Sequence, residues 1–328
     1  MRSRDPVALS EAVLGGDRTA LPRLLSVVEG GGPPAREVGR RVYGRGGTAY
    51  TVGVTGPPGA GKSTLTDRMI AAVRAAGNEV AVLAVDPSSP YSGGALLGDR
   101  VRMMDHALDS GVFVRSMATR GHLGGLAVAV PEVLRVLDAA GFPTVLVETV
   151  GVGQSEVEIA GSADTTIVVL TPGAGDSVQA NKAGLLEVAD LFVINKADQP
   201  QVRDLERDLE FMMELTTWPD GWRPPIVKTV AVKDEGVDDV LGAIARHREH
   251  LTSTGLLERR RARRALEELR RVLVAQFEQR ARQAAGDERW HDLMDEVAGR
   301  RLDPWSAAEE ILDGLVNGDP PAPDASPG

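Results

Sequence analysis

The stretch GVTGPPGAGKST, residues 53–64, decides the fold. Residues 56–63 match the pattern G-x-x-x-x-G-K-[ST] at every fixed position, between a strand-like apolar run and a helix-like segment. In that context the backbone amides of the loop surround a phosphate group, and the following helix adds the partial positive charge of its N-terminus. The sequence therefore predicts a P-loop nucleotide site.

The residues of this loop have separate expected roles. Lys62 is expected to reach the β- and γ-phosphates, and the Ser63 hydroxyl is expected to ligate Mg²⁺. Glycines let the backbone come close to a phosphate without a side chain in between. The predicted nucleotide-binding residues here are Gly56, Pro57, Pro58, Gly59, Ala60, Gly61, Lys62, Ser63 and Thr64.

Apolar runs and helical segments alternate between about residue 50 and residue 250. The helical segments include 62–76, 122–140 and 200–216, and the runs are Val-rich and nearly continuous, as strands buried on both faces should be. This alternation predicts an α/β fold of the P-loop NTPase type, with a mainly parallel central sheet flanked by helices. The six runs are AYTVGVTG, EVAVLAVD, PTVLVETV, TTIVVLTP, DLFVIN and PIVKTVAV.

Both ends of the chain differ from this central pattern. Short amphipathic helices are expected before residue 45, and one long charged helix is expected after residue 255, followed by two shorter ones. The last residues, GDPPAPDASPG, have the composition of a disordered end. We expect an N-terminal helical extension (1–45), a P-loop GTPase domain (46–252), a C-terminal helical dimerisation arm (253–318) and a disordered tail (319–328).

The long helix carries an apolar stripe. Ala262, Leu266, Leu269, Leu273 and Phe277 recur at helical spacing, and the rest of the surface is strongly charged. An exposed stripe of this kind needs a partner, so we expect a homodimer contact. The alternative is that the stripe packs on the GTPase domain of its own chain.

Composition excludes several classes of function. The 328 residues include no cysteine, which excludes disulfides, thiolate metal sites and thiol nucleophiles. A net charge of -10 argues against a general nucleic-acid binder. Neither a signal-peptide core nor an apolar run of membrane-spanning length is evident. We therefore expect a soluble cytoplasmic protein with no nucleic-acid or membrane partner.

The segment LFVINKAD predicts which base the nucleotide carries. The carboxylate of Asp198 can accept from N1–H and the 2-amino group of guanine, whereas adenine would leave it unpaired. Asn195 can tie this loop to the phosphate loop, and the stem of Lys196 can lie over the base. The backbone amide of Ala231 is the candidate for guanine O6, although Val230 stands where many GTPases have Ser.

Three further acidic residues are expected near the metal ion. Asp86 and Glu148 each end a strand-like run, and Asp99 follows a Gly-rich segment. Together with Ser63 they are the predicted Mg²⁺ ligands, directly or through water, because Mg²⁺ prefers oxygen donors and keeps several waters. Any one of these acids could instead cap a helix or a turn. The amide of Gly151, three residues after Glu148, is the predicted sensor of the γ-phosphate.

Two loops hold candidate switch residues. Gln154 could position the attacking water, but the familiar catalytic Gln lies one residue after the sensing Gly, where this chain has Val152. Its catalytic role therefore stays open. A second loop after the next strand holds Asp176, Gln179 and Lys182, which form a polar cluster unless Asp176 is simply a helix cap.

With these motifs identified, the chain resembles the methylmalonyl-CoA mutase-associated GTPases of the MeaB/ArgK type. The resemblance rests on TGPPGAGKSTL, VDPSSPYSGGALLGDRVRM, RSMATRGHLGGLA, VETVGVGQSE, TPGAGDSVQANKAGLLEVAD and NKAD. It implies a homodimeric GTPase that serves as chaperone to an adenosylcobalamin-dependent acyl-CoA mutase and gates cofactor loading and protection.

The same resemblance assigns roles to residues. It implies that Ser63, Asp86, Asp99 and Glu148 form the Mg²⁺ network, that 148–158 is a switch, and that the loop with Asp176, Gln179 and Lys182 communicates with the client. No arginine finger is evident, so Lys182 is the expected transition-state cation beside Lys62 and Glu148.

Three other classes of function remain. A nickel-type metallochaperone GTPase should carry Cys/His ligand clusters, and this chain has no cysteine and five scattered histidines. A P-loop small-molecule kinase needs an acceptor pocket with a base beside Lys62, and it would leave the N-K-x-D segment unexplained. A binding partner that never hydrolyses nucleotide is the third. Competition between GTP and ATP, and a single-turnover assay, would separate these classes.

Overall fold

The computed structural model describes residues 5–87, 106, 108–119, 123–149, 162–173 and 186–317, with the side chains of 86, 87, 118, 119, 123–128 and 315–317 excepted. The chain divides into two compact units, Met1–Ala262 and Arg263–Gly328. The first unit contains a parallel sheet and the helices around it. The second contains helices.

Seven parallel strands form the sheet, in the order β3-β2-β4-β1-β5-β6-β7. This confirms the predicted α/β fold and its mainly parallel sheet. Six of the strands coincide with the six apolar runs, and β3 was not predicted. Their bounds are β1 (Tyr50–Thr55), β2 (Val80–Pro87), β3 (Val112–Thr119), β4 (Thr144–Thr149), β5 (Thr165–Leu170), β6 (Leu191–Asn195) and β7 (Ile226–Thr229).

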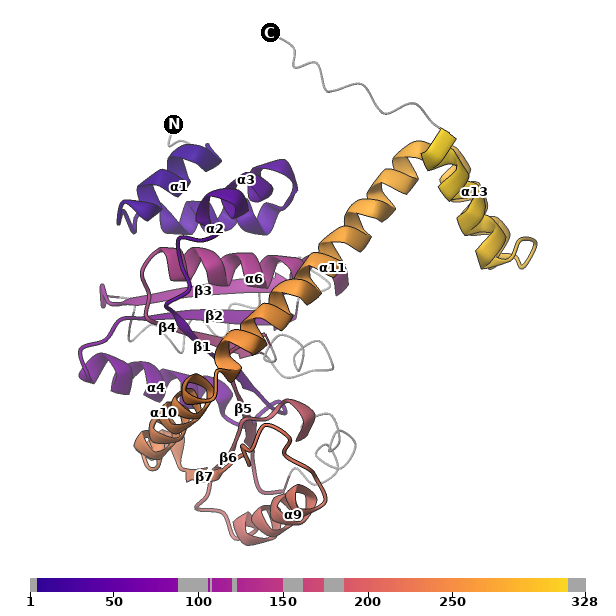
Figure 1. Cartoon of the computed structure of the whole chain (residues 1–328). Helices are drawn as coiled ribbons and strands as arrows, with labels where there is room; N and C mark the ends of the chain where they lie inside the picture. The colour runs from indigo at the N-terminus through magenta and orange to yellow at the C-terminus, as the bar shows by residue number, and fades with distance from the viewer. Residues whose placement is uncertain are drawn as a thin grey trace. The chain divides into compact units, whose positions relative to one another are not determined.

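Helices cover both faces of the sheet, which explains why strands β5 and β6 are buried at every position (Figure 1). Alternate residues of one strand meet different helices: in β5, Ile167 and Val169 belong to the cluster with α4 and α10, whereas Val168 and Leu170 pack with α9. Helix α6 covers the face formed by β2 and β4 on the side of α9. These helices are α4 (Lys62–Ala75), α6 (Leu123–Ala139), α9 (Val202–Glu214) and α10 (Val237–Ser253).

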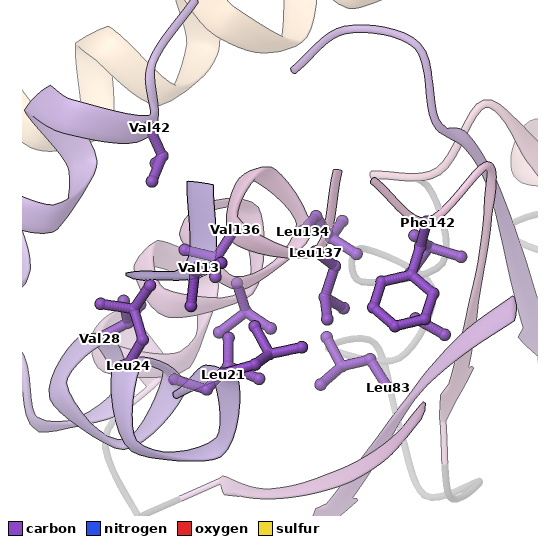
Figure 2. Packing of buried hydrophobic residues seen from close by; sticks show 14 of the residues in the cluster. Val13, Leu21, Leu24, Val28, Val42, Leu83, Leu134, Val136, Leu137 and Phe142 are labelled. Atoms are coloured by element: carbon purple, nitrogen blue, oxygen red, sulfur yellow. The ribbon is translucent and has the colours of Figure 1, made fainter. Parts of the chain in front are cut away.

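Before β1 the chain forms α1 (Pro6–Leu14), α2 (Leu21–Gly30) and α3 (Gly32–Val42). Helix α1 begins after Asp5, whose carboxylate accepts from the amides of Val7 and Ala8, each at 3.2 Å. Figure 2 shows the apolar side chains of these helices gathered against α6 and the sheet. The extension is therefore part of the core of the first unit. Figure 2 labels Val13, Leu21, Leu24, Val28, Val42, Leu83, Leu134, Val136, Leu137 and Phe142.

At the edge where the strands begin, two buried carboxylates hold the first turns of helix α11 (Leu256–Ala285). Arg261 donates to Asp164 through Nε at 3.1 Å and through Nη2 at 2.6 Å, and Arg260 Nη1 donates to Asp190 at 2.8 Å. Asp164 directly precedes β5 and Asp190 directly precedes β6. Consecutive arginines thus fasten the start of α11 to two neighbouring strands.

A buried histidine lies beside these two arginine–aspartate ion pairs. His247 on α10 is fully buried, with Nδ1 2.8 Å from the Thr165 hydroxyl and Nε2 3.3 Å from Asp190. Burial lowers its pKa to about 4, because the pull of Asp190 toward the charged form is weaker than the desolvation and is opposed by Arg260. The imidazole is therefore neutral at neutral pH.

The second unit holds the rest of α11 together with α12 (Asp287–Ala298) and α13 (Pro304–Asn317). Arg289 on α12 donates to Glu310 on α13 at 2.7 and 2.9 Å, which joins the two shorter helices. Across the described residues, none of the helices combines the length and the apolar character that a membrane span requires.

Candidate nucleotide site

The phosphate loop connects β1 to α4, and its shape depends on glycine. Gly56 and Gly61 have φ values of 138° and 88°. A Cβ at Gly56 would overlap the carbonyl oxygen of Val169 on β5, and a Cβ at Gly61 would overlap the side-chain nitrogen of Asn195. Side chains are thus excluded at both positions by conformation and by space.

Helix α4 begins directly after the loop. Gly61 precedes the helix in the left-handed region and supplies no side-chain cap. The N-terminus of the helix carries a partial positive charge that favours an anion. The loop and the helix together form the kind of site that binds phosphate.

Lys62 is buried and folds back over the loop. Its Nζ donates to the carbonyl oxygen of Gly56 at 2.6 Å and to that of Pro57 at 3.1 Å. A phosphate group in the loop would lie within reach of this ammonium, which would then exchange some carbonyl partners for phosphate oxygens. The role of Lys62 toward the β- and γ-phosphates stays a prediction.

Ser63 and Glu148 meet beneath the loop. The Ser63 hydroxyl donates to Glu148 Oε1 at 2.5 Å, and both side chains are buried. Glu148 lies near the end of β4, in register with Val54 of β1 and Ala84 of β2. The sheet register therefore brings the carboxylate to the phosphate loop.

These two side chains fit a Mg²⁺ site. A hydroxyl and a carboxylate supply oxygen donors alone, and Mg²⁺ needs one or two such ligands beside waters and phosphates. Asp86 is the last residue but one of β2, two residues beyond Ala84, so its backbone lies at the same edge of the sheet, while its side chain is outside the described residues. Asp99 lies outside the described residues altogether.

Asn195 joins three loops. Its Nδ2 donates to the carbonyl oxygen of Ala60 in the phosphate loop at 2.9 Å, which is the tie that the sequence predicts. Its Oδ1 accepts from the Thr229 hydroxyl and from the Ala231 amide, both at 3.1 Å. The three bonds fix the loops after β1, β6 and β7 relative to one another.

This arrangement affects two predicted base contacts. The amide of Ala231, expected to meet guanine O6, already donates to Asn195, so a base oxygen would have to share it. Lys196 has φ 57°, and its Nζ donates to the carbonyl oxygen of Gly59 at 2.8 Å. Both residues nevertheless lie on the loops where they were expected.

Asp198, the predicted base-recognition residue, pairs with Lys233 at 3.1 Å. The bond from Lys233 lowers the pKa of Asp198, and the same bond raises the pKa of Lys233. Neither Lys233 nor Thr229 was predicted from the sequence to belong to the site. Thr229 supplies a hydroxyl one residue before Val230, where Ser is more usual, and a search for hydroxyls next to that position would have found it.

The predicted switch residues fall on other parts of the chain. Gly151, Gln154, Asp176, Gln179 and Lys182 all lie outside the described residues. Their assignments therefore stay predictions. Within the described residues, the structure brings together the phosphate loop, Glu148 and the loops around Asn195 and Ala231.

Comparisons with known proteins identify the family of the chain. The family model described as Methylmalonyl Co-A mutase-associated GTPase MeaB matches residues 21–286. A Pyrococcus abyssi protein named as a GTPase is 46% identical over 313 residues, which span 94% of this chain and 97% of that protein. GTPase ArgK of Escherichia coli is 38% identical over 264 residues, 78% of this chain and 80% of that protein.

A solved structure extends the likeness to the fold. The crystal structure of LAO/AO transport system kinase matches with a TM-score of 0.72 and 26% identity, over 96% of this chain and 99% of that one. The family model covers well over half of the chain, and the relatives cover most of it. The chain therefore belongs to the MeaB family of methylmalonyl-CoA mutase-associated GTPases.

Proposed function

We propose that this MeaB-family protein hydrolyses GTP to GDP and phosphate with Mg²⁺, and thereby gates cofactor loading and protection of an adenosylcobalamin-dependent acyl-CoA mutase. The family description names methylmalonyl-CoA mutase, which supports a client of that type. The observation that carries the GTPase part is the position of Asn195. Its side chain bonds to the phosphate loop and to the loop of Ala231, so the loop proposed to bind phosphate is held in a fixed position relative to the loop proposed to bind the base.

Each of the described site residues would have a separate role in phosphoryl transfer to water. The attacking water oxygen bonds to the γ-phosphorus while the bond from that phosphorus to the bridging oxygen of GDP breaks. Lys62 would stabilise the charge that develops on the β- and γ-oxygens. Ser63 and Glu148 would hold Mg²⁺, which neutralises phosphate charge when bound. Asp198 would select guanine.

The predicted catalytic residues are Lys62, Glu148 and Lys182, and no arginine finger is evident in the sequence. We assign the role of transition-state cation to Lys182 and expect slow hydrolysis by the protein alone, with acceleration when a client mutase orders the switch loops. Comparing GTP turnover of Lys182→Ala with and without the mutase tests this. Unchanged stimulation by the mutase would remove Lys182 from the mechanism.

A second copy of the chain is the other proposed partner. The residues Leu266, Leu269, Leu273, Val274 and Phe277 of α11 are all more than half exposed, between 52% and 67%. Leu266, Leu269, Leu273 and Phe277 follow one another at spacings of three or four residues, so they form an apolar stripe. We propose that this stripe supplies the homodimer contact.

The central experiment measures nucleotide turnover and binding by the purified chain. GTP with Mg²⁺ should be hydrolysed and ATP should not compete with it. Lys62→Ala should abolish tight GTP binding, since Lys62 is the cation within the phosphate loop. Preference for ATP together with phosphorylation of a small acceptor would instead favour a kinase, and retained GTP affinity in Lys62→Ala would contradict the phosphate site.

A further inference from the structure

A lysine that the proposed function has not used contacts the carboxylate that would read the base. Lys233 ends the short helix η2 (Ala231–Lys233), two residues after the Ala231 amide. Its Nζ lies 3.1 Å from Asp198 Oδ2, and both side chains are about half exposed. The pair therefore connects the loop after β6 to the loop after β7 at the rim of the base site.

The backbone sets the position of Lys233 without help from its side chain. The Lys233 amide donates to the Val230 carbonyl oxygen at 2.8 Å, and the Val230 amide donates to the backbone carbonyl oxygen of Glu235 at 3.0 Å. Asp234 then turns in the left-handed region at φ 61°. A substitution of the Lys233 side chain should leave this turn intact.

Guanine recognition requires one orientation of the aspartate carboxylate, and a freely rotating side chain adopts that orientation only part of the time. N1–H and the 2-amino group of guanine donate in parallel, so both carboxylate oxygens must face the same edge. A half-exposed aspartate can rotate about its side-chain bonds, and fixing it costs conformational entropy. An ammonium bonded to Oδ2 restricts that rotation, and the second lone pair of Oδ2 stays available to a base donor.

We propose that Lys233 is a positioning residue for guanine specificity, which holds the Asp198 carboxylate in the orientation that accepts both N1–H and the 2-amino group. The inference rests on the proposed function, because it requires Asp198 to read guanine. Lys233 itself does not contact the base. Val230 stands where many GTPases have Ser and brings no hydroxyl to this loop, whereas the Thr229 hydroxyl donates to Asn195.

A neighbouring ion pair provides a matched control. Lys228 on β7 donates to Glu206 on α9 at 2.9 Å and is also about half exposed. Glu206 belongs to neither the phosphate loop nor the base loop. Removing Lys228 deletes the same kind of pair, five residues away in the chain, without touching Asp198.

The test compares Lys233→Met, Lys233→Arg and Lys228→Met in the full chain. Competition against a fluorescent GDP analogue gives the dissociation constants of GDP and of inosine diphosphate, whose base lacks the 2-amino group. Lys233→Met should lower the preference for GDP over inosine diphosphate about three-fold, the size that an exposed ion pair supports. Lys233→Arg should restore the preference, and Lys228→Met should leave it unchanged.

Three results would overturn the proposal. The preference could stay unchanged in Lys233→Met, it could rise because the lysine competes with the base, or Lys228→Met could lower it equally. Each of these can occur while wild-type protein binds GDP in preference to ADP, so they count against Lys233 alone. A wild-type protein without that preference would contradict the proposed function as well.

Discussion

Ser63 and Glu148 are 85 residues apart in the chain, yet the hydroxyl of one donates to the carboxylate of the other at 2.5 Å. The contact exists because β4 lies directly beside β1, which places the end of one strand under the loop that leaves the other. A glutamate bridges the distance to the hydroxyl here. An aspartate at position 148 would be one methylene shorter.

This relationship makes a prediction about Mg²⁺-dependent turnover. Glu148→Gln keeps the size of the side chain and removes its charge, so kcat for GTP should fall about 100-fold, a loss typical of removing one electrostatic contributor. GDP affinity without Mg²⁺ should change little. Glu79→Gln, which alters a carboxylate paired with Arg18 before β2, should retain wild-type kcat. Equal turnover in Glu148→Gln and wild type would exclude Glu148 from the metal site.

His247 should make stability depend on pH. Its folded-state pKa of about 4 lies below the ordinary value of 6.5, so the unfolded chain binds a proton that the folded protein excludes. This group therefore costs stability as pH falls from 6.5 toward 4, by about 2 kcal/mol between pH 7 and pH 5. Urea unfolding at those two pH values measures the loss.

His247→Gln is the control for urea unfolding at pH 7 and pH 5, because glutamine does not titrate. It should be less stable than wild type at pH 7, because it disturbs the contacts with Thr165 and Asp190. Its stability should nevertheless fall less between pH 7 and pH 5. A fall as large as in wild type would mean that other groups cause the acid sensitivity.

Arg261 should contribute strongly to the stability of the first unit. It donates twice to Asp164, which is 1% exposed, and also to the carbonyl oxygens of Gly47 and Ala49. Arg261→Met leaves a buried carboxylate without its cation, so the free energy of unfolding should drop by about 3 kcal/mol. Arg263→Met, two residues along α11, removes an exposed pair with Glu267 and should cost less than about 0.5 kcal/mol.

The apolar stripe of α11 should determine the mass in solution. Wild-type protein should have the mass of a dimer by light scattering, and Leu269→Asp combined with Leu273→Asp should have that of a monomer. Arg271→Asp introduces the same charge at an exposed position off the stripe and should remain dimeric. A monomeric wild type would refute the proposed dimer.

The sequence predicts most of the sheet because its strands are apolar on both faces. Strand β3 escaped prediction since Arg115 and Ser116 interrupt its apolar pattern. It is an edge strand of the sheet, and Arg115 is accommodated by two bonds of 2.7 Å to Glu29 on α2. In the sequence around it, the charge of Arg115 indicates a loop. The contact with Glu29, 86 residues away in the chain, allows a strand there instead.

The site, like the sheet, has a part that the sequence predicts and a part that depends on contacts between distant segments. The phosphate loop and the Asn195 segment are contiguous motifs, so their residues could be found by spacing alone. Thr229 and Lys233 act on residues of another loop, and only the pairing of β6 with β7 brings them to Asn195 and Asp198. Sequence spacing within one segment carries no information about that pairing.

The two bonds of Lys62 to the carbonyl oxygens of Gly56 and Pro57 have a consequence for substitutions at this position. The ammonium is bonded to the backbone of the loop, so replacing Lys62 removes two hydrogen bonds of the loop together with its cation. A loss of nucleotide affinity in Lys62→Ala would therefore combine a lost charge with a changed loop.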